Sequence, residues 1–89
     1  MRTDYLYLSD IVQAAEAVSR FVADVDEAQF VADDLLRRAV LHKLAVIGEA
    51  AARVSPELRQ ANPGIPWADI VGFRNIAVHA CFAVDWRLV

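Results

Sequence analysis

Hydrophobic positions recur at helical spacing along most of the chain. From about Thr3 to Val22, apolar side chains fall on one side of a helix and polar side chains on the other. This pattern predicts an amphipathic helix with a single buried stripe. The stripe consists of Leu8, Ile11, Val12, Ala15, Val18 and Val22.

A second helical stretch follows, and it is apolar around most of its circumference. Asp26 and Gln29 have the spacing of a capping box, and the helical pattern then continues to about Val54. A helix of this kind is buried on more than one side. We therefore expect a homodimer built around the helix from about Asp33 to Val54. Its apolar positions are Leu36, Val40, Leu44, Ile47, Ala51 and Val54, widened by Leu35, Ala39, Val46 and Ala50. The remaining polar line is Arg38, His42, Glu49 and Arg53, with Ala45 in the gap.

The second half of the chain predicts shorter helices separated by turns. Ser55 suits an N-cap and Pro56 suits the first helical position. The segment 62–66 (Asn-Pro-Gly-Ile-Pro) predicts a turn, and Pro66 then opens a helix through about Val78. Asp85 would cap one more helix, of which the chain holds only the first turn. The elements together predict an all-α antiparallel helical bundle in one domain, residues 1–89, truncated at its C-terminus.

Composition limits the class of protein. The chain has 89 residues, of which 57% are hydrophobic, so its apolar content indicates either a partner subunit or a missing segment. No apolar run approaches the roughly 20 residues of a membrane span, and the start lacks a signal-peptide pattern. One cysteine allows no intrachain disulfide, which fits a cytoplasmic protein. The net charge of −3 excludes a polybasic surface, so any RNA must bind a local positive cleft.

The segment from Arg74 to His79 holds the candidate chemistry. An arginine offers a fixed set of donors that matches a phosphate, and a histidine can move protons near neutral pH. Together they could cleave a phosphodiester without a metal ion. Their spacing sets them about 140° apart on an ideal helix, whereas Asn75 shares a face with His79. From spacing alone, a structural alternative stays open: Arg74 in a salt bridge and His79 as a helix-end residue.

Two residues of the polar line have competing interpretations. Glu49 either pairs with Arg53 one turn later or orients Arg74 of the same subunit. His42 is interpreted as a packed or solvated histidine and not as part of a site.

Trp67 and Cys81 are interpreted as structural. Trp67 fits a core position better than a platform for stacking a base. Cys81 is most often a small buried hydrophobe, and a lone cysteine beside one histidine does not make a metal site. The three glycines are isolated, so they form no phosphate-binding loop. We expect neither a metal ion nor another cofactor.

Three segments resemble the HepT-like toxins of the HEPN superfamily: IGEAA at 47–51, PGIPWADIVGFRN at 63–75 and RNIAVHACFAVD at 74–85. The resemblance covers nearly the whole chain in order. It implies a helical bundle that dimerises, with two Arg-x4-His motifs facing each other across a cleft. It also implies metal-independent endoribonuclease activity, with Arg74 and His79 as the catalytic pair and Asn75 at the substrate. The implied partners are RNA and a minimal nucleotidyltransferase antitoxin.

Two departures from the family pattern separate two hypotheses. The family motif continues His-x-Tyr, and the antitoxin attaches AMP to that tyrosine; here Cys81 occupies the modification-site position. The family also continues through a further helix after the segment that holds Asp85. The first hypothesis is an active toxin-type endoribonuclease, favoured by Arg74, Asn75 and His79. The alternative, favoured by the two departures, is a non-catalytic or degraded HEPN module that engages a nucleotidyltransferase partner.

Overall fold

Helices account for all the regular structure in the part of the chain that the structure describes. The computed structural model describes residues 3–75. In that range α1 covers Asp4–Phe21, α2 covers Glu27–Ala32, α3 covers Asp34–Arg53, α4 covers Pro56–Ala61 and α5 covers Trp67–Val71. No strand occurs within these residues. The predicted all-α class is therefore confirmed.

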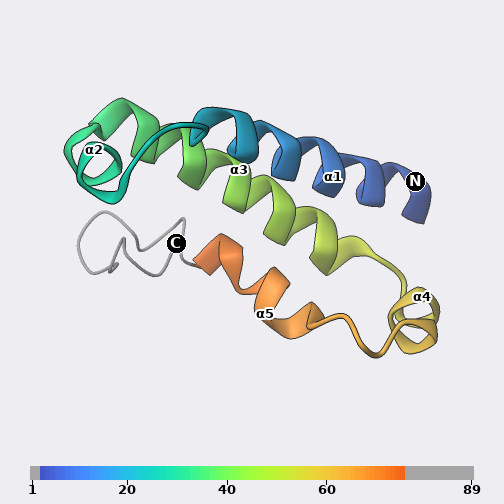
Figure 1. Cartoon of the computed structure of the whole chain (residues 1–89). Helices are drawn as coiled ribbons and strands as arrows, with labels where there is room; N and C mark the ends of the chain where they lie inside the picture. The colour runs from blue at the N-terminus through green and yellow to red at the C-terminus, as the bar shows by residue number, and fades with distance from the viewer. Residues whose placement is uncertain (1–2, 76–89) are drawn as a thin grey trace.

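The central element is α3, with α1 running antiparallel along one side and α5 along the other (Figure 1). The short helices α2 and α4 occupy the turns at opposite ends of α3. The core is made mostly by α3, where Val40 is 1% exposed and Ala51 is 0% exposed. Two helices of the same chain thus explain why α3 is apolar around most of its circumference. The width of its apolar surface is therefore not by itself a reason to expect a dimer.

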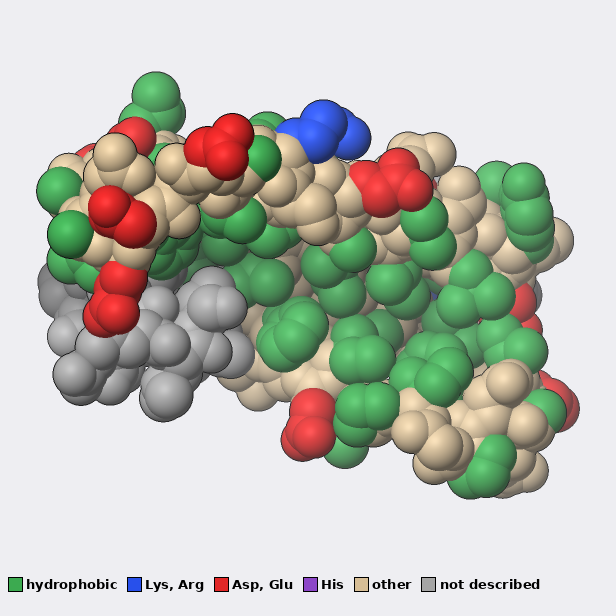
Figure 2. Space-filling view, viewed as in Figure 1, with side chains coloured by type: hydrophobic (Ala, Val, Ile, Leu, Met, Phe, Trp, Pro, Cys, Tyr) green, Lys and Arg blue, Asp and Glu red, His purple; other side chains and the backbone are tan. Residues whose placement is uncertain are grey.

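The buried side of α1 differs from the stripe that the sequence predicts. Its most deeply buried residues are Ala14 and Ala17, whereas Val12 is 54% exposed and Ala15 is also exposed. Small side chains make the contact because they let the axes of two helices approach closely. The larger apolar residues of the stripe lie to one side of this contact and are half-buried: Leu8, Ile11, Val18 and Val22. Figure 2 shows hydrophobic side chains gathered in a band over α3 and the adjoining sides of α1 and α5.

The predicted helical stretch from Asp26 to Val54 is broken at Asp33. The capping box is confirmed, since the Gln29 amide donates to Asp26 Oδ1 at 2.7 Å and the Asp26 amide donates to Gln29 Oε1 at 3.0 Å. However, α2 ends after six residues, and the Asp33 carboxylate accepts from the Leu36 amide at 3.0 Å. An aspartate that bonds the backbone in this way starts a new helix and does not continue the old one. Leu35, in the first turn of the new helix, is 79% exposed and does not widen the buried surface.

Two aspartates that begin helices, Asp4 and Asp34, have a lowered pKa. Asp4 accepts hydrogen bonds from the Ser55 hydroxyl at 2.6 Å and the Ser55 amide at 2.9 Å, which lower its pKa below the ordinary 3.8. This contact ties the start of α1 to the start of α4, where Ser55 is the N-cap and Pro56 opens the helix, as predicted. At the start of α3, the hydrogen bond from Arg38 is the main cause of the lowered pKa of Asp34.

The predicted turn at 62–66 is present and leads into α5. The indole N–H of Trp67 donates to the carbonyl of Asn62 at 3.1 Å, which closes the turn. The predicted helix from Pro66 to about Val78 is interrupted: α5 ends at Val71, the chain turns at Gly72, and residues 73–75 are helical again. Glycine weakens a helix by about 1 kcal/mol relative to alanine, which accounts for a break at this point. The end of the predicted helix and Asp85 lie outside the described residues.

Candidate functional site

Arg74 lies beside α3, where its guanidinium meets the carboxylate of Glu49. Its Nη1 donates to Glu49 Oε1 at 3.4 Å, and the two side chains are 43% and 51% exposed. An ion pair this long and this accessible contributes little to stability. It does set the direction of the arginine side chain, with guanidinium donors still open to solvent.

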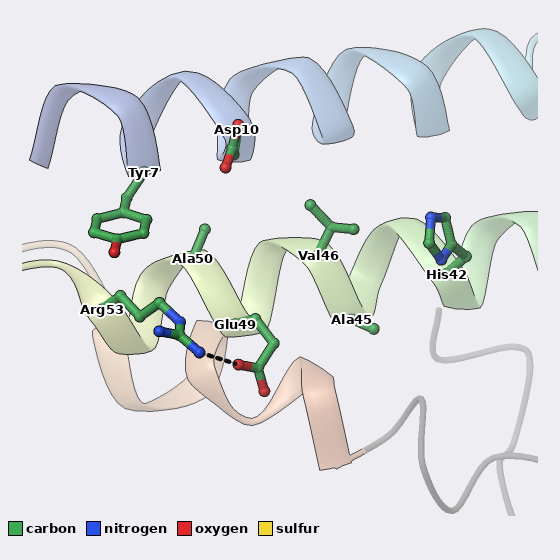
Figure 3. A pocket seen from close by; sticks show the side chains of 8 residues that line it. All are labelled: Tyr7, Asp10, His42, Ala45, Val46, Glu49, Ala50 and Arg53. Carbon is green, nitrogen blue, oxygen red and sulfur yellow. Dashed lines mark ion pairs between the residues drawn. The ribbon is translucent and has the colours of Figure 1, made fainter. Parts of the chain in front are cut away.

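Glu49 also pairs with Arg53 one turn later on α3. Its second oxygen, Oε2, lies 3.7 Å from Arg53 Nη2 (Figure 3). The two interpretations of Glu49 from the sequence are therefore both present as contacts, one on each carboxylate oxygen. A single carboxylate holds two guanidinium groups near each other on one exposed surface.

The approach of Arg74 to α3 depends on Gly48, which is buried in that helix. A Cβ atom added at Gly48 would lie 2.6 Å from the backbone nitrogen of Arg74 and 3.1 Å from the carbonyl oxygen of Val71. Only a residue without a side chain allows the backbone after α5 to come this close. Gly48 thus sets the distance between the two segments, and Glu49, the next residue, receives the guanidinium.

Of the other residues considered in the sequence, the structure describes Asn75 and Trp67 but not His79 and Cys81. Asn75 is exposed, and its amide donates to the carbonyl of Gly72 at 3.0 Å. His79 and Cys81 lie outside the described residues, so the pairing of Arg74 with His79 stays a prediction. Trp67 is half-buried and bonded through its indole, which agrees with a structural role.

A groove of about 370 Å³ lies between α1 and α3, next to this ion-paired cluster. Its α3 side includes Ala45, Val46 and Ala50 with Glu49 among them, and its α1 side is formed by Tyr7 and Asp10. In Figure 3 Tyr7 and Arg53 lie at one end of the groove, and His42 lies at the other. The complete lining is Tyr7, Asp10, His42, Ala45, Val46, Glu49, Ala50 and Arg53.

Sequence reasoning missed the contribution of α1 to this groove. Tyr7 and Asp10 are three residues apart and share a helix face, but nothing in α1 alone shows that this face lies against the polar line of α3. His42, which the sequence predicts to be packed or solvated, is exposed and lines the groove. Among residues 3–75, no group of three or more His, Cys, Asp or Glu could hold a metal ion. None of the helices in that range is long and apolar enough to cross a bilayer.

The fold and the site define an all-helical protein with an arginine held by a glutamate at the edge of a groove. The chain belongs to the HepT-like ribonuclease family, because the family model described as "Ribonuclease HepT-like" matches residues 11–89. The residues matched include Glu49 and Arg74. The expected family membership is thus confirmed.

Several relatives of the chain are named as putative or probable ribonucleases. A protein of Methanocaldococcus jannaschii named "Putative RNase MJ1380" is 36% identical over 83 residues, which cover 93% of this chain and 76% of that protein. A protein of Caldanaerobacter subterraneus named "Putative RNase TTE0752" is 34% identical over 89 residues, covering 100% of this chain and 80% of that protein. A "Probable ribonuclease HepT" of Thermococcus cleftensis is 32% identical over 83 residues, with coverage of 93% and 76%. No solved structure matches the chain.

Proposed function

We propose that this protein is a toxin-type endoribonuclease that cleaves RNA without a metal ion, and that Arg74 and His79 are its catalytic residues. The observation that supports this most directly is the position of Arg74, whose guanidinium is directed by Glu49 while it remains accessible to solvent. The membership of a ribonuclease family supports RNA as the substrate.

In the proposed reaction, Arg74 binds the scissile phosphate and stabilises the negative charge that develops in the transition state. The ribose 2′-hydroxyl attacks phosphorus, the bond to the 5′-oxygen breaks, and a 2′,3′-cyclic phosphate forms. His79 takes or gives the proton as general base or acid. Asn75 holds a phosphate oxygen or positions His79, and Glu49 supports Arg74.

The proposal includes a homodimer in which the two copies of this motif face each other across a cleft. This part rests on the family resemblance and not on the width of α3. Sedimentation at tens of micromolar measures it directly. A monomer at that concentration would contradict the dimeric site.

Cleavage of RNA in the presence of EDTA tests the catalytic assignment. We expect weak cleavage by the parent protein, and its loss in Arg74→Ala and His79→Ala with unchanged far-UV circular dichroism. The matched control is Arg38→Ala, which removes an exposed arginine from the same polar line of α3 but well away from Glu49. Cleavage by His79→Ala at the parental rate would rule out the mechanism.

The second candidate, a non-catalytic module that binds a nucleotidyltransferase antitoxin, is favoured by Cys81 at the position of the family's modified tyrosine. If the antitoxin acts by adding AMP to that tyrosine, the parent protein should gain no AMP and Cys81→Tyr should gain it. Intact mass spectrometry after incubation with ATP, magnesium and a nucleotidyltransferase of this type measures the difference. Modification of the parent, or none in a Cys81→Tyr protein that binds the enzyme, would contradict this expectation.

A further inference from the structure

The groove between α1 and α3 combines an apolar floor and an aromatic ring with an exposed arginine. Its floor is apolar, formed by Ala45, Val46 and Ala50, and Tyr7 places an aromatic ring beside Arg53 at one end (Figure 3). Its volume of about 370 Å³ lies inside the range of about 300–1,000 Å³ that is usual for small-molecule sites. The groove is therefore large enough for one nucleotide unit.

Single-stranded RNA is recognised by this combination of groups. Unstacked bases pack on aromatic rings and apolar surface, and arginines bind the phosphates between them. Arg53 is 63% exposed, and its 3.7 Å contact with Glu49 leaves most of its donors available to a phosphate. The exposed His42 adds a polar group that can bond a base edge or a ribose hydroxyl.

The groove is continuous with the catalytic arginine through Glu49. One oxygen of this carboxylate meets Arg74 at 3.4 Å and the other meets Arg53 at 3.7 Å. Two guanidinium groups on one carboxylate are close enough to bind neighbouring phosphates of a single strand. If the scissile phosphate of an RNA strand binds Arg74, the adjacent nucleotide would therefore lie near Arg53 and Tyr7.

We propose that this groove binds the nucleotide next to the scissile phosphate of a single-stranded RNA, with the base against Tyr7 and the adjoining phosphate on Arg53. The assignment rests on the proposed function, because it takes Arg74 as the residue that binds the scissile phosphate. It adds Tyr7 and Arg53 as substrate-binding residues, neither of which belongs to the Arg-x4-His motif.

The test measures RNA binding separately from RNA cleavage. The full chain with His79→Ala is titrated against a fluorescein-labelled single-stranded oligoribonucleotide, and fluorescence anisotropy gives Kd at several salt concentrations. Added to this background, Tyr7→Ala should weaken binding by about 5- to 150-fold, as loss of a stacked base does. Tyr7→Phe should bind nearly as well as the background, because it keeps the ring. If Tyr7→Ala does not fold, Ala45→Leu, which narrows the groove from its floor, takes its place and should also weaken binding.

Arg53→Gln should weaken binding and reduce the slope of log K against log salt by about 0.7, the loss of one phosphate contact on a single strand. Arg38→Gln is the matched control on the same helix, away from the groove, and should leave the slope unchanged. An unchanged slope in Arg53→Gln would overturn the assignment, as would equal binding by the Tyr7→Ala and Tyr7→Phe variants. Loss of binding to a nucleotidyltransferase but not to RNA in these variants would also overturn it, in favour of a protein-docking groove.

These outcomes separate the groove from the nuclease. Cleavage by the parent protein that is insensitive to Tyr7 and Arg53 would reject the groove and keep the proposed function. RNA binding that depends on the groove, in a protein that never cleaves RNA, would reject the nuclease and the position beside a scissile phosphate, and would keep the groove as an RNA-binding site only.

Discussion

Replacement of Gly48 by alanine should damage the site more than it damages the fold. The added Cβ would lie 2.6 Å from the backbone nitrogen of Arg74, and ordinary contact begins at 3.4 Å, so one segment must retreat by about 0.8 Å. The atom in the way belongs to the backbone, and a second one, the carbonyl oxygen of Val71, lies 3.1 Å from the same Cβ position. A side-chain rotation therefore cannot relieve the clash, and the segment from α5 to Arg74 has to move away from α3.

The two effects of the substitution on stability partly cancel. Alanine favours the helix over glycine by about 1 kcal/mol, whereas overpacking a closely packed contact costs about 1–3 kcal/mol. We expect a net loss of about 1 kcal/mol, which lowers the melting temperature of a domain this small by about 4–8 °C. The rate of RNA cleavage should be affected more strongly than the stability. A displacement near 1 Å at a catalytic group can lower the rate by about 100-fold.

Thermal unfolding followed by circular dichroism measures the first effect, and cleavage of RNA with EDTA present measures the second. Gly64→Ala is the matched control, since no atom lies within 4 Å of a Cβ built at Gly64. It should keep both the melting temperature and the cleavage rate of the parent. A Gly48→Ala protein that melts no lower than the parent and cleaves RNA at the same rate would refute the role of Gly48 in placing Arg74.

Three further predictions test the fold, each with its own substitutions. Asp33→Ala should destabilise the protein by about 1 kcal/mol in urea unfolding through loss of the α3 cap, and Asp33→Asn should cost little; equal losses would contradict the cap. Val40→Ala should cost about 2 kcal/mol because its side chain is buried, whereas Val12→Ala, at an exposed position, should change little; a reversed order would mean that the core is misassigned. Hydrogen bonds from Ser55 lower the pKa of Asp4 in the folded state. The ionised carboxylate of Asp4 therefore stabilises the fold at pH values above the ordinary carboxyl pKa, and this stabilisation is lost as the pH falls through the folded-state pKa. Asp4→Asn should therefore melt below the parent near neutral pH and approach it in acid, and a difference in melting temperature that does not depend on pH would contradict the linkage.

The parts of the fold that depend on residues close together in the sequence could be predicted from the sequence. The capping box at Asp26 and the cap at Ser55 form through bonds to amides three residues away, so the sequence pattern is enough. The break at Asp33 was also local, but the helical pattern continues across it and conceals the change of helix. The residues on the buried side of α1 depend on which face α3 presents, and periodicity within α1 could not reveal that Ala14 and Ala17 make the contact.

The sequence predicts which residues belong to the candidate site but not how they contact one another. The resemblance implied Arg74 as a catalytic residue, and Glu49 was a candidate from its place on the polar line. Their contact joins positions 25 residues apart, and the sequence leaves it as one of two interpretations of Glu49. The groove was missed because Tyr7 comes from a different helix. A property that arises from two helices in contact has no pattern in either helix alone.

The segment IGEAA shows how neighbouring residues of one helix serve different contacts. Successive residues of an α-helix point about 100° apart, so each one faces a different neighbour. Ile47 and Ala51 lie one turn apart and are buried in the core. Gly48 faces the backbone at Arg74, and Glu49 points outward to its guanidinium. Because the glycine sets the separation of the segments and the glutamate sets the direction of the arginine, neither could be moved along the helix without losing the other's effect. The adjacency of the two residues is thus a requirement of the contact between Arg74 and α3.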